Sequence, residues 1–183
     1  LKILAMLSTE ERKSIIALIH SQVLPAIGCT EPIAVALCVA KARELLGTLP
    51  ESIDIELSAN ILKNAMGVGI PGTGMIGLPI AVALGAIVGR PELELEVLQD
   101  SNKEAVERGK AYIAEDRIHI SLKEDAPDKL YIAVKCSAGG HEAEARIMHM
   151  HTNFVYLRKD ADVMLDNMAP REEEAKQVEV ELT

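Results

Sequence analysis

The stretch that decides the fold is Ile118-His-Ile-Ser-Leu122, followed by Leu130-Tyr-Ile-Ala-Val-Lys-Cys136. In both segments the apolar side chains recur at every second position, which is the period of a β-strand with one buried face. The turn-forming residues Asp125-Ala-Pro-Asp128 lie between them, so we expect the two strands to pair as a hairpin. Gly139-Gly140 then predicts a turn into a third strand over about residues 141–157.

The residues before this stretch predict a fourth strand and several helices. Ile53, Ile55 and Leu57 alternate with polar residues, as in a half-buried strand. A Ser8-x-x-Glu11 capping box and apolar residues at helical spacing predict the helices, which we expect over about residues 8–25, 30–46, 78–88 and 91–114. The sequence therefore predicts an α+β fold, with helices packed on an antiparallel sheet of about four strands.

The 183 residues divide into a main part and a tail. Residues 1–158 contain the predicted strands and the four helices named above, and are long enough for one domain with a core of its own. Residues 159–183 are acidic and poor in large apolar side chains. We therefore expect one α+β domain followed by an acidic C-terminal tail or linker.

Composition excludes several classes of function. The net charge is −9 and the cationic residues form no cluster, which argues against binding to nucleic acid. The longest apolar run, residues 75–88, is interrupted by glycine and proline and is shorter than the roughly 20 residues that span a bilayer. Three cysteines without the spacing of a secreted framework favour a reducing compartment. We expect a cytoplasmic protein that binds neither membrane nor nucleic acid.

Cys29 is the first candidate for chemistry. It lies in Gly28-Cys-Thr-Glu-Pro32, just before a predicted helix, where unpaired amide groups and the helix dipole favour a thiolate. The neighbouring Glu31 acts in the opposite direction. A small residue that fills a helix-turn corner is the alternative reading. Cys38 and Cys136 fall on apolar faces and are expected in the core.

A glycine-rich segment is the second candidate. Gly72-Thr-Gly-Met-Ile-Gly77 matches the G-x-G-x-x-G pattern, yet no strand directly precedes it, as a dinucleotide site requires. A backbone nest for a substrate carboxylate and close helix packing without a ligand both remain open.

Polar side chains near this segment and in the third strand complete the candidates. Asn60, Lys63 and Asn64 interrupt an apolar stretch, either to recognise a zwitterion or as part of a solvated loop. His149 and His151 alternate along the predicted third strand together with Asn153, so all three are expected on one face. Three interpretations remain open: a zinc site, buried hydrogen-bonded histidines, and side chains that line a site. No third ligand stands at a fixed spacing, which argues against zinc.

Three segments together resemble the L-cysteine desulfidase family, which is related to the alpha chain of iron–sulfur L-serine dehydratases. They are Pro25-Ala-Ile-Gly-Cys-Thr-Glu-Pro32, Asn60-Ile-Leu-Lys-Asn64 with Gly69-Ile-Pro-Gly-Thr-Gly74, and His151-Thr-Asn153. The order and spacing of these segments extend the resemblance over about residues 10–158.

The resemblance implies a lyase that releases sulfide or water, plus ammonia, from L-cysteine or L-serine and leaves pyruvate, using a [4Fe-4S] cluster. Cys29 matches the cysteine proposed as the proton acceptor. We infer that the pocket for the small L-amino acid is lined by Thr30, Glu31, Asn60, Lys63, Asn64, Gly72, Thr73, Gly74, His151, Thr152 and Asn153.

One departure from the family bears on activity. The three cluster-ligand cysteines of the family lie in a carboxy-terminal half, and no cysteine follows Cys136 here. We therefore expect no metal site in this chain, which would be the amino-terminal part of a larger enzyme and inactive alone. The expected partners are the missing cluster domain or a companion chain, and a second copy in a homodimer.

Two alternatives to an enzyme stay open. In the first, the glycine-rich segment holds a small amino acid without chemistry, as a binding or regulatory module. In the second, the chain is a structural domain whose helices serve to dimerise.

Overall fold

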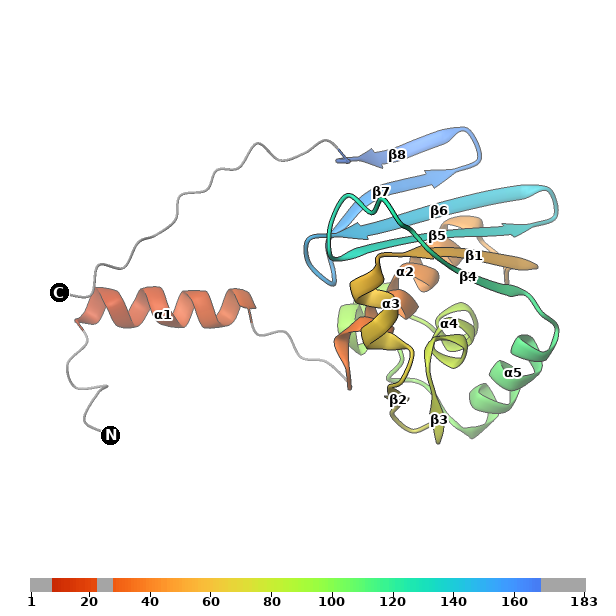
Figure 1. Ribbon diagram of the computed structural model, residues 1–183, viewed down its shortest axis with the longest axis horizontal. Coiled ribbons are helices and arrows are strands. Elements are labelled where there is room, and N and C mark those ends of the chain that lie inside the picture. The colour runs from red at the N-terminus through yellow and green to blue at the C-terminus, as the bar shows by residue number, and fades with distance from the viewer. Residues whose placement is uncertain (1–7, 23–27, 169–183) are drawn as a thin grey trace.

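The computed structural model describes residues 8–22 and 28–168. Its main sheet has six strands (Figure 1): β1 (Ser52–Leu57), β4 (Ile118–Leu122), β5 (Tyr131–Ala138), β6 (His141–Met148), β7 (Phe154–Lys159) and β8 (Asp162–Asp166). The strand order across it is β4-β1-β5-β6-β7-β8. A separate pair is formed by β2 (Gly69–Ile70) and β3 (Met75–Ile76). The sheet and its helices confirm the α+β class.

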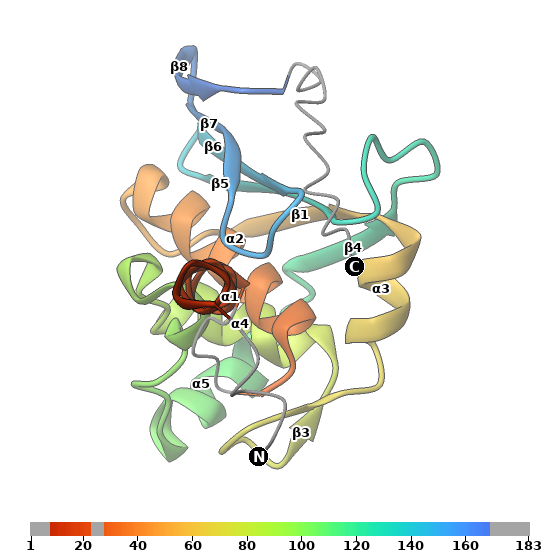
Figure 2. The ribbon, with the colours of Figure 1, turned by 90° about the vertical axis from the view of Figure 1, so that its left-hand side faces the viewer.

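The described helices are α1 (Thr9–Gln22), α2 (Thr30–Leu46), α3 (Ala59–Ala65), α4 (Leu78–Ile87), α5 (Lys103–Ala114) and a 3₁₀ helix over Pro91–Glu96. Figures 1 and 2 show α2, α4 and α5 gathered on one side of the sheet. None of the described helices is both long enough and apolar enough to cross a membrane.

The core lies between the sheet and the helix pair α2 and α4. The side chains from Ile33 to Ala40 are all 1% exposed or less, so α2 is surrounded on nearly every side. A glycine lets the two helices approach closely, because a Cβ added at Gly85 of α4 would lie 2.6 Å from the carbonyl oxygen of Ala36 in α2. The core is largely aliphatic and includes Ile53, Ile55 and Leu57 of β1.

The prediction that residues 118–122 and 130–136 pair as a hairpin is wrong. β1 lies between β4 and β5, so that Ile53 is opposite Ile118 on one side and Cys136 on the other. β1 runs parallel to β4 and antiparallel to β5, which makes the sheet mixed. The alternating pattern shows which side chains face the core, but the partner of a strand depends on contacts far apart in sequence.

The prediction of one strand over residues 141–157 is also wrong. Two strands, β6 and β7, are separated by a turn in which His149 adopts a left-handed φ of 70°. The side-chain amide of Asn153 donates to the carbonyl oxygen of Met148 at 2.9 Å and helps to close this turn. His149, His151 and Asn153 therefore do not share one strand face.

The sheet also extends beyond the expected domain. The expected boundary at residue 158 falls inside the hairpin of β7 and β8, and β8 continues to Asp166. The division of residues 141–157 into β6 and β7 adds one strand and β8 adds another, so the sheet has six strands instead of about four. Residues 169–183 of the expected acidic tail lie outside the described residues.

Helix ends follow local sequence signals more closely. The capping box is confirmed, because the Ser8 amide donates to the Glu11 carboxylate at 2.6 Å and the Glu11 amide donates to the Ser8 hydroxyl at 3.2 Å. α2 ends at Leu46, where Gly47 has a left-handed φ of 85°. The expected helix over residues 91–114 is instead split, because Asn102 caps a new helix, α5, by accepting from the amide of Ala105.

Candidate functional site

Glu31 is the centre of the predicted site. The Cys29 thiol donates a hydrogen bond to Glu31 Oε2 at 2.9 Å, and the Thr30 hydroxyl donates to the same oxygen at 3.3 Å. The Asn64 amide of α3 reaches Glu31 Oε1 at 3.5 Å. The start of α2 and the end of α3 therefore meet, and we call these four residues the Glu31 cluster.

Local backbone geometry explains why these side chains converge. Cys29 is in extended conformation, with φ −68° and ψ 133°, and occupies the N-cap position of α2. Glu31 lies in the first turn of that helix, where the dipole and the unpaired amide groups favour a carboxylate. Its side chain bends back to the thiol, since the two residues are only two positions apart.

The glycine-rich segment packs against this helix start. Gly28 has a left-handed φ of 97°, and a Cβ there would lie 2.8 Å from Cγ of Pro71. Glycine is therefore required at position 28 for both conformation and space. Pro71 was not among the predicted site residues, although a proline directly before Gly72 marks a rigid point of the loop.

Gly72, Thr73 and Gly74 form the turn between β2 and β3. The glycines have left-handed φ values of 76° and 66°, and no atom lies within 4 Å of a Cβ added at either. The Thr73 hydroxyl donates to the carbonyl oxygen of Ile70 at 2.7 Å and accepts from the amide of Met75 at 2.9 Å. The Thr73 hydroxyl thus stabilises the turn, while the two glycines leave its backbone open to solvent.

The loop between β6 and β7 brings a third segment toward the Glu31 cluster. His151 is half-buried, and its charge is among the influences that lower the pKa of Glu31, of which the hydrogen bond from Cys29 is the largest. Thr152 and Asn153 are half-buried as well. Asn153 holds its own turn, so His151 is the residue of this segment with an electrostatic link to the cluster.

Asn60 and Lys63 lie at a different place from Cys29. They line an open pocket of about 500 Å³ between the start of α3 and the loop after β4, together with Ser58, Ala59, Lys123, Glu124, Ala126, Asp128 and Lys129. Asp128, which the sequence indicated only as part of a turn, pairs with His149 at 2.6 Å and accepts from the Leu130 amide at 2.7 Å. The hydrogen bond to the amide two residues later is the contact that such a turn predicts.

The thiol of Cys29 is held in its neutral form. Burial raises its pKa most, and the hydrogen bond that it donates to Glu31 raises it further. These effects outweigh the helix terminus, so the expectation of a thiolate at Cys29 is not met in the free chain. Cys29 therefore starts as a hydrogen-bond donor, and it can act as a base only after it loses its proton.

The other two cysteines belong to the core, as predicted. Cys38 and Cys136 are fully buried, and the Cys38 thiol donates to the carbonyl oxygen of Ala145 at 3.2 Å. Burial raises the pKa of Cys136 to about 12. Neither thiol is available as a metal ligand without opening the core.

The described residues do not fit an iron–sulfur cluster. Over residues 8–22 and 28–168, no group of three or more histidine, cysteine, aspartate or glutamate side chains is placed to hold a metal ion. The three thiols also lie in separate surroundings, one hydrogen-bonded to Glu31 and two in the core.

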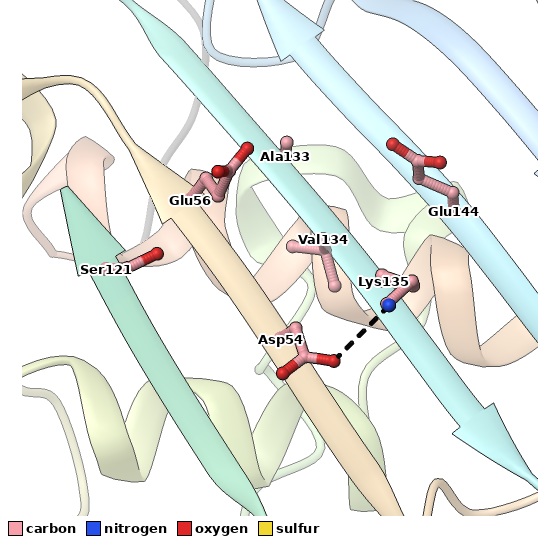
Figure 3. A pocket seen from close by; sticks show the side chains of 7 residues that line it. All are labelled: Asp54, Glu56, Ser121, Ala133, Val134, Lys135 and Glu144. Atoms are coloured by element: carbon pink, nitrogen blue, oxygen red, sulfur yellow. Dashed lines mark ion pairs between the residues drawn. The ribbon is translucent and has the colours of Figure 1, made fainter. Parts of the chain in front are cut away.

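A further hollow of about 360 Å³ lies on the face of the sheet opposite the helices (Figure 3) and is lined by Asp54, Glu56, Ser121, Ala133, Val134, Lys135 and Glu144. Lys135 lies 3.8 Å from both Asp54 and Glu142, and Glu144 pairs with Arg146 and Arg158. These charges neutralise one another across neighbouring strands, which is the usual role of cross-strand ion pairs. None of the predicted site residues lies there.

The chain is similar to proteins named UPF0597 protein. It is 63% identical over 177 residues to one from Bacteroides fragilis, covering 97% of this chain and 41% of that protein. It is 63% identical over 172 residues to one from Bacteroides thetaiotaomicron, covering 94% of this chain and 40% of that protein. It is 46% identical over 149 residues to one from Oleidesulfovibrio alaskensis, covering 81% of this chain and 35% of that protein. No family model and no solved structure matches the chain. The chain spans about two fifths of the length of the Bacteroides relatives, whose printed names state no activity.

Proposed function

We propose that this chain is the amino-terminal part of an iron–sulfur-dependent lyase that converts L-cysteine or L-serine to pyruvate, releasing ammonia and either sulfide or water. In this proposal Cys29 exchanges the proton at the α-carbon of the amino acid. The Glu31 cluster, the glycine turn and His151 surround the substrate. The cluster ligands belong to sequence outside this chain, because the described side chains offer no set that fits.

The observation that supports this proposal is the meeting of three segments that are distant in sequence. The thiol of Cys29, the carboxylate of Glu31 and the amide of Asn64 are joined by hydrogen bonds, and Pro71 packs against Gly28. A half-buried thiol, a carboxylate and exposed backbone amides provide one proton carrier, one partner for an ammonium group and one for a carboxylate. A small zwitterionic amino acid needs this combination.

The chemistry places defined demands on these residues. A base takes the α-proton, the electron pair of the broken C–H bond forms the Cα–Cβ double bond, and the bond from Cβ to sulfur or oxygen breaks with its pair on the leaving atom. The resulting enamine becomes an imine that water hydrolyses to pyruvate and ammonia. From this chain, the thiolate of Cys29 would take the proton, while Glu31 and the glycine turn orient the substrate.

The test is an anaerobic assay of a full-length protein that contains this chain, purified with its cluster, for pyruvate and sulfide from L-cysteine and for pyruvate from L-serine. We expect Cys29→Ala to abolish turnover, while the matched Cys136→Ala, a change in the core, retains it in a protein that folds. Absence of turnover on both substrates by the unchanged protein would contradict the proposal.

One observation favours a second candidate, a module that binds a small amino acid without chemistry. The raised pKa of Cys29 makes its thiol a donor in the free chain, as in a binding site. The kinetic constants separate the two candidates: an enzyme loses kcat in Cys29→Ala, whereas a binding module loses only affinity for the amino acid.

A further inference from the structure

We propose that Glu31 is the positioning residue that controls the protonation of Cys29: its carboxylate orients the thiol hydrogen and, while ionised, holds the proton on the sulfur. The inference deepens the proposed function and rests on it for the catalytic meaning. The coupling between the two side chains is a property of this chain alone, and it can be measured without turnover.

Geometry is the first support. Glu31 Oε2 lies 2.9 Å from the sulfur of Cys29, and the same carboxylate accepts from the Thr30 hydroxyl and the Asn64 amide at 3.3 and 3.5 Å. Donors from two elements therefore fix the carboxylate in the orientation that faces the thiol. A surface carboxylate without a positioning role would be hydrated by water and would not need hydrogen-bond donors from both α2 and α3.

The charges around the pair oppose ionisation of the thiol. The hydrogen bond from Cys29 is the largest influence that lowers the pKa of Glu31, and the same bond adds to the effect of burial in raising the pKa of Cys29. Both shifts keep the proton on the sulfur. His151, from the loop between β6 and β7, adds a positive influence on Glu31. From the other packed elements, α3 presents the neutral amide of Asn64 to the carboxylate, and the turn at residues 69–74 has no ionisable side chain.

While Glu31 is ionised, its negative charge and the burial of the thiol together keep the proton on Cys29. When the ammonium group of a bound amino acid pairs with Glu31, that charge is balanced, and the S–H bond of Cys29 can break with its proton passing to solvent. The thiolate then forms a new S–H bond with the α-proton of the substrate. Glu31 thus holds Cys29 in its donor form until the substrate is bound.

The test is the rate at which iodoacetamide alkylates Cys29 in this chain between pH 6 and pH 10, measured by mass spectrometry of the Cys29 peptide. In Glu31→Gln the negative charge and the anionic acceptor are lost, so the profile should move to lower pH and the rate at pH 7.5 should rise severalfold. Glu44→Gln, the same change near the other end of α2, should leave the profile unchanged.

Glu31→Asp keeps the charge on a side chain one methylene shorter, and it serves if the glutamine variant does not fold. Its profile should lie between those of the unchanged chain and Glu31→Gln. An unchanged profile in a folded Glu31→Gln or Glu31→Asp chain would overturn the inference. A shifted profile beside a full-length protein that turns over neither substrate would support the coupling and overturn the proposed reaction instead.

Discussion

Replacing Gly85 with alanine is expected to lower the free energy of unfolding by about 1–2 kcal/mol. The added methyl group would lie 2.6 Å from the carbonyl oxygen and 3.1 Å from the Cα of Ala36. Both atoms belong to the backbone of the buried helix α2, so no side chain can rotate away. Overpacking of this kind costs about 1–3 kcal/mol, whereas alanine gains about 1 kcal/mol over glycine in helix propensity. Because the contacted atoms are backbone and cannot rotate away, the steric cost falls in the upper part of that range, about 2–3 kcal/mol, and exceeds the gain in helix propensity.

Urea unfolding followed by circular dichroism at 222 nm is the suitable assay, because the chain contains no tryptophan. With a urea m-value of roughly 1–3 kcal/mol per molar, a loss of about 1.5 kcal/mol moves the midpoint down by roughly 0.5–1.5 M. Gly67→Ala is the matched control. No atom lies within 4 Å of a Cβ added there, and Gly67 does not have a left-handed φ.

Gly67→Ala restricts the unfolded chain in the same way and should change stability by no more than about 0.5–1 kcal/mol, in the stabilising direction if at all. The difference between the two variants isolates the contact of α4 with α2. Equal midpoints for Gly85→Ala and Gly67→Ala would refute the close approach of the two helices.

Three other changes test the remaining structure. Glu144→Gln should lower stability by about 1–3 kcal/mol in urea unfolding, because the carboxylate is 14% exposed and pairs with Arg158 at 3.3 Å. Ser58→Ala should cost about 1–3 kcal/mol in the same assay, since it leaves the carbonyl oxygen of Lys129 without the 2.6 Å hydrogen bond from the serine hydroxyl. The pKa of Glu31 is lowered, chiefly by the hydrogen bond from Cys29. The ionised Glu31 side chain therefore contributes its full stabilisation above the unfolded pKa of about 4.3, and this stabilisation is lost as pH falls through the folded pKa. Glu31→Gln should accordingly reduce the pH dependence of the urea midpoint on the acid side.

Local signals in the sequence predicted the helix ends well. The capping box at Ser8 and the stop at Gly47 depend on residues within one turn, so the sequence contains all of the information. The split before α5 was missed although Asn102 lies in a polar run over residues 99–104 and asparagine is a strong N-cap.

Strand pairing could not be predicted in the same way. The alternation in residues 118–122 and 130–136 placed Ile132, Val134 and Cys136 in the core, whereas Leu122 is 46% exposed. It contained no information about β1, which inserts between the two strands. At residues 149–153 the alternation continued through a turn, because a left-handed His149 and the amide of Asn153 change direction without changing the polar pattern. Both errors arise from contacts or backbone angles that side-chain periodicity does not encode.

Prediction of the candidate site from sequence motifs was limited in the same way. The inferred pocket grouped Glu31, Asn64 and His151 with Cys29, and the structure links them by hydrogen bonds or charge. The inference also grouped Asn60 and Lys63 with them, whereas these two side chains line a pocket that Cys29 does not reach. Which face of a seven-residue helix meets which loop depends on packing that a motif cannot specify.

The protonation of Cys29 follows from two parts of one short motif that act against each other. The N-terminus of α2 carries about half a positive charge, which favours an anion near the first turn. Glu31 already supplies that anion at 2.9 Å from the sulfur, with a full negative charge that opposes a second one. The helix terminus therefore stabilises the carboxylate, and the thiol, also partly buried, keeps its proton. Any event that neutralises Glu31 removes the main charge that opposes a thiolate at Cys29, so the reactivity of the cysteine depends on the state of a residue two positions away.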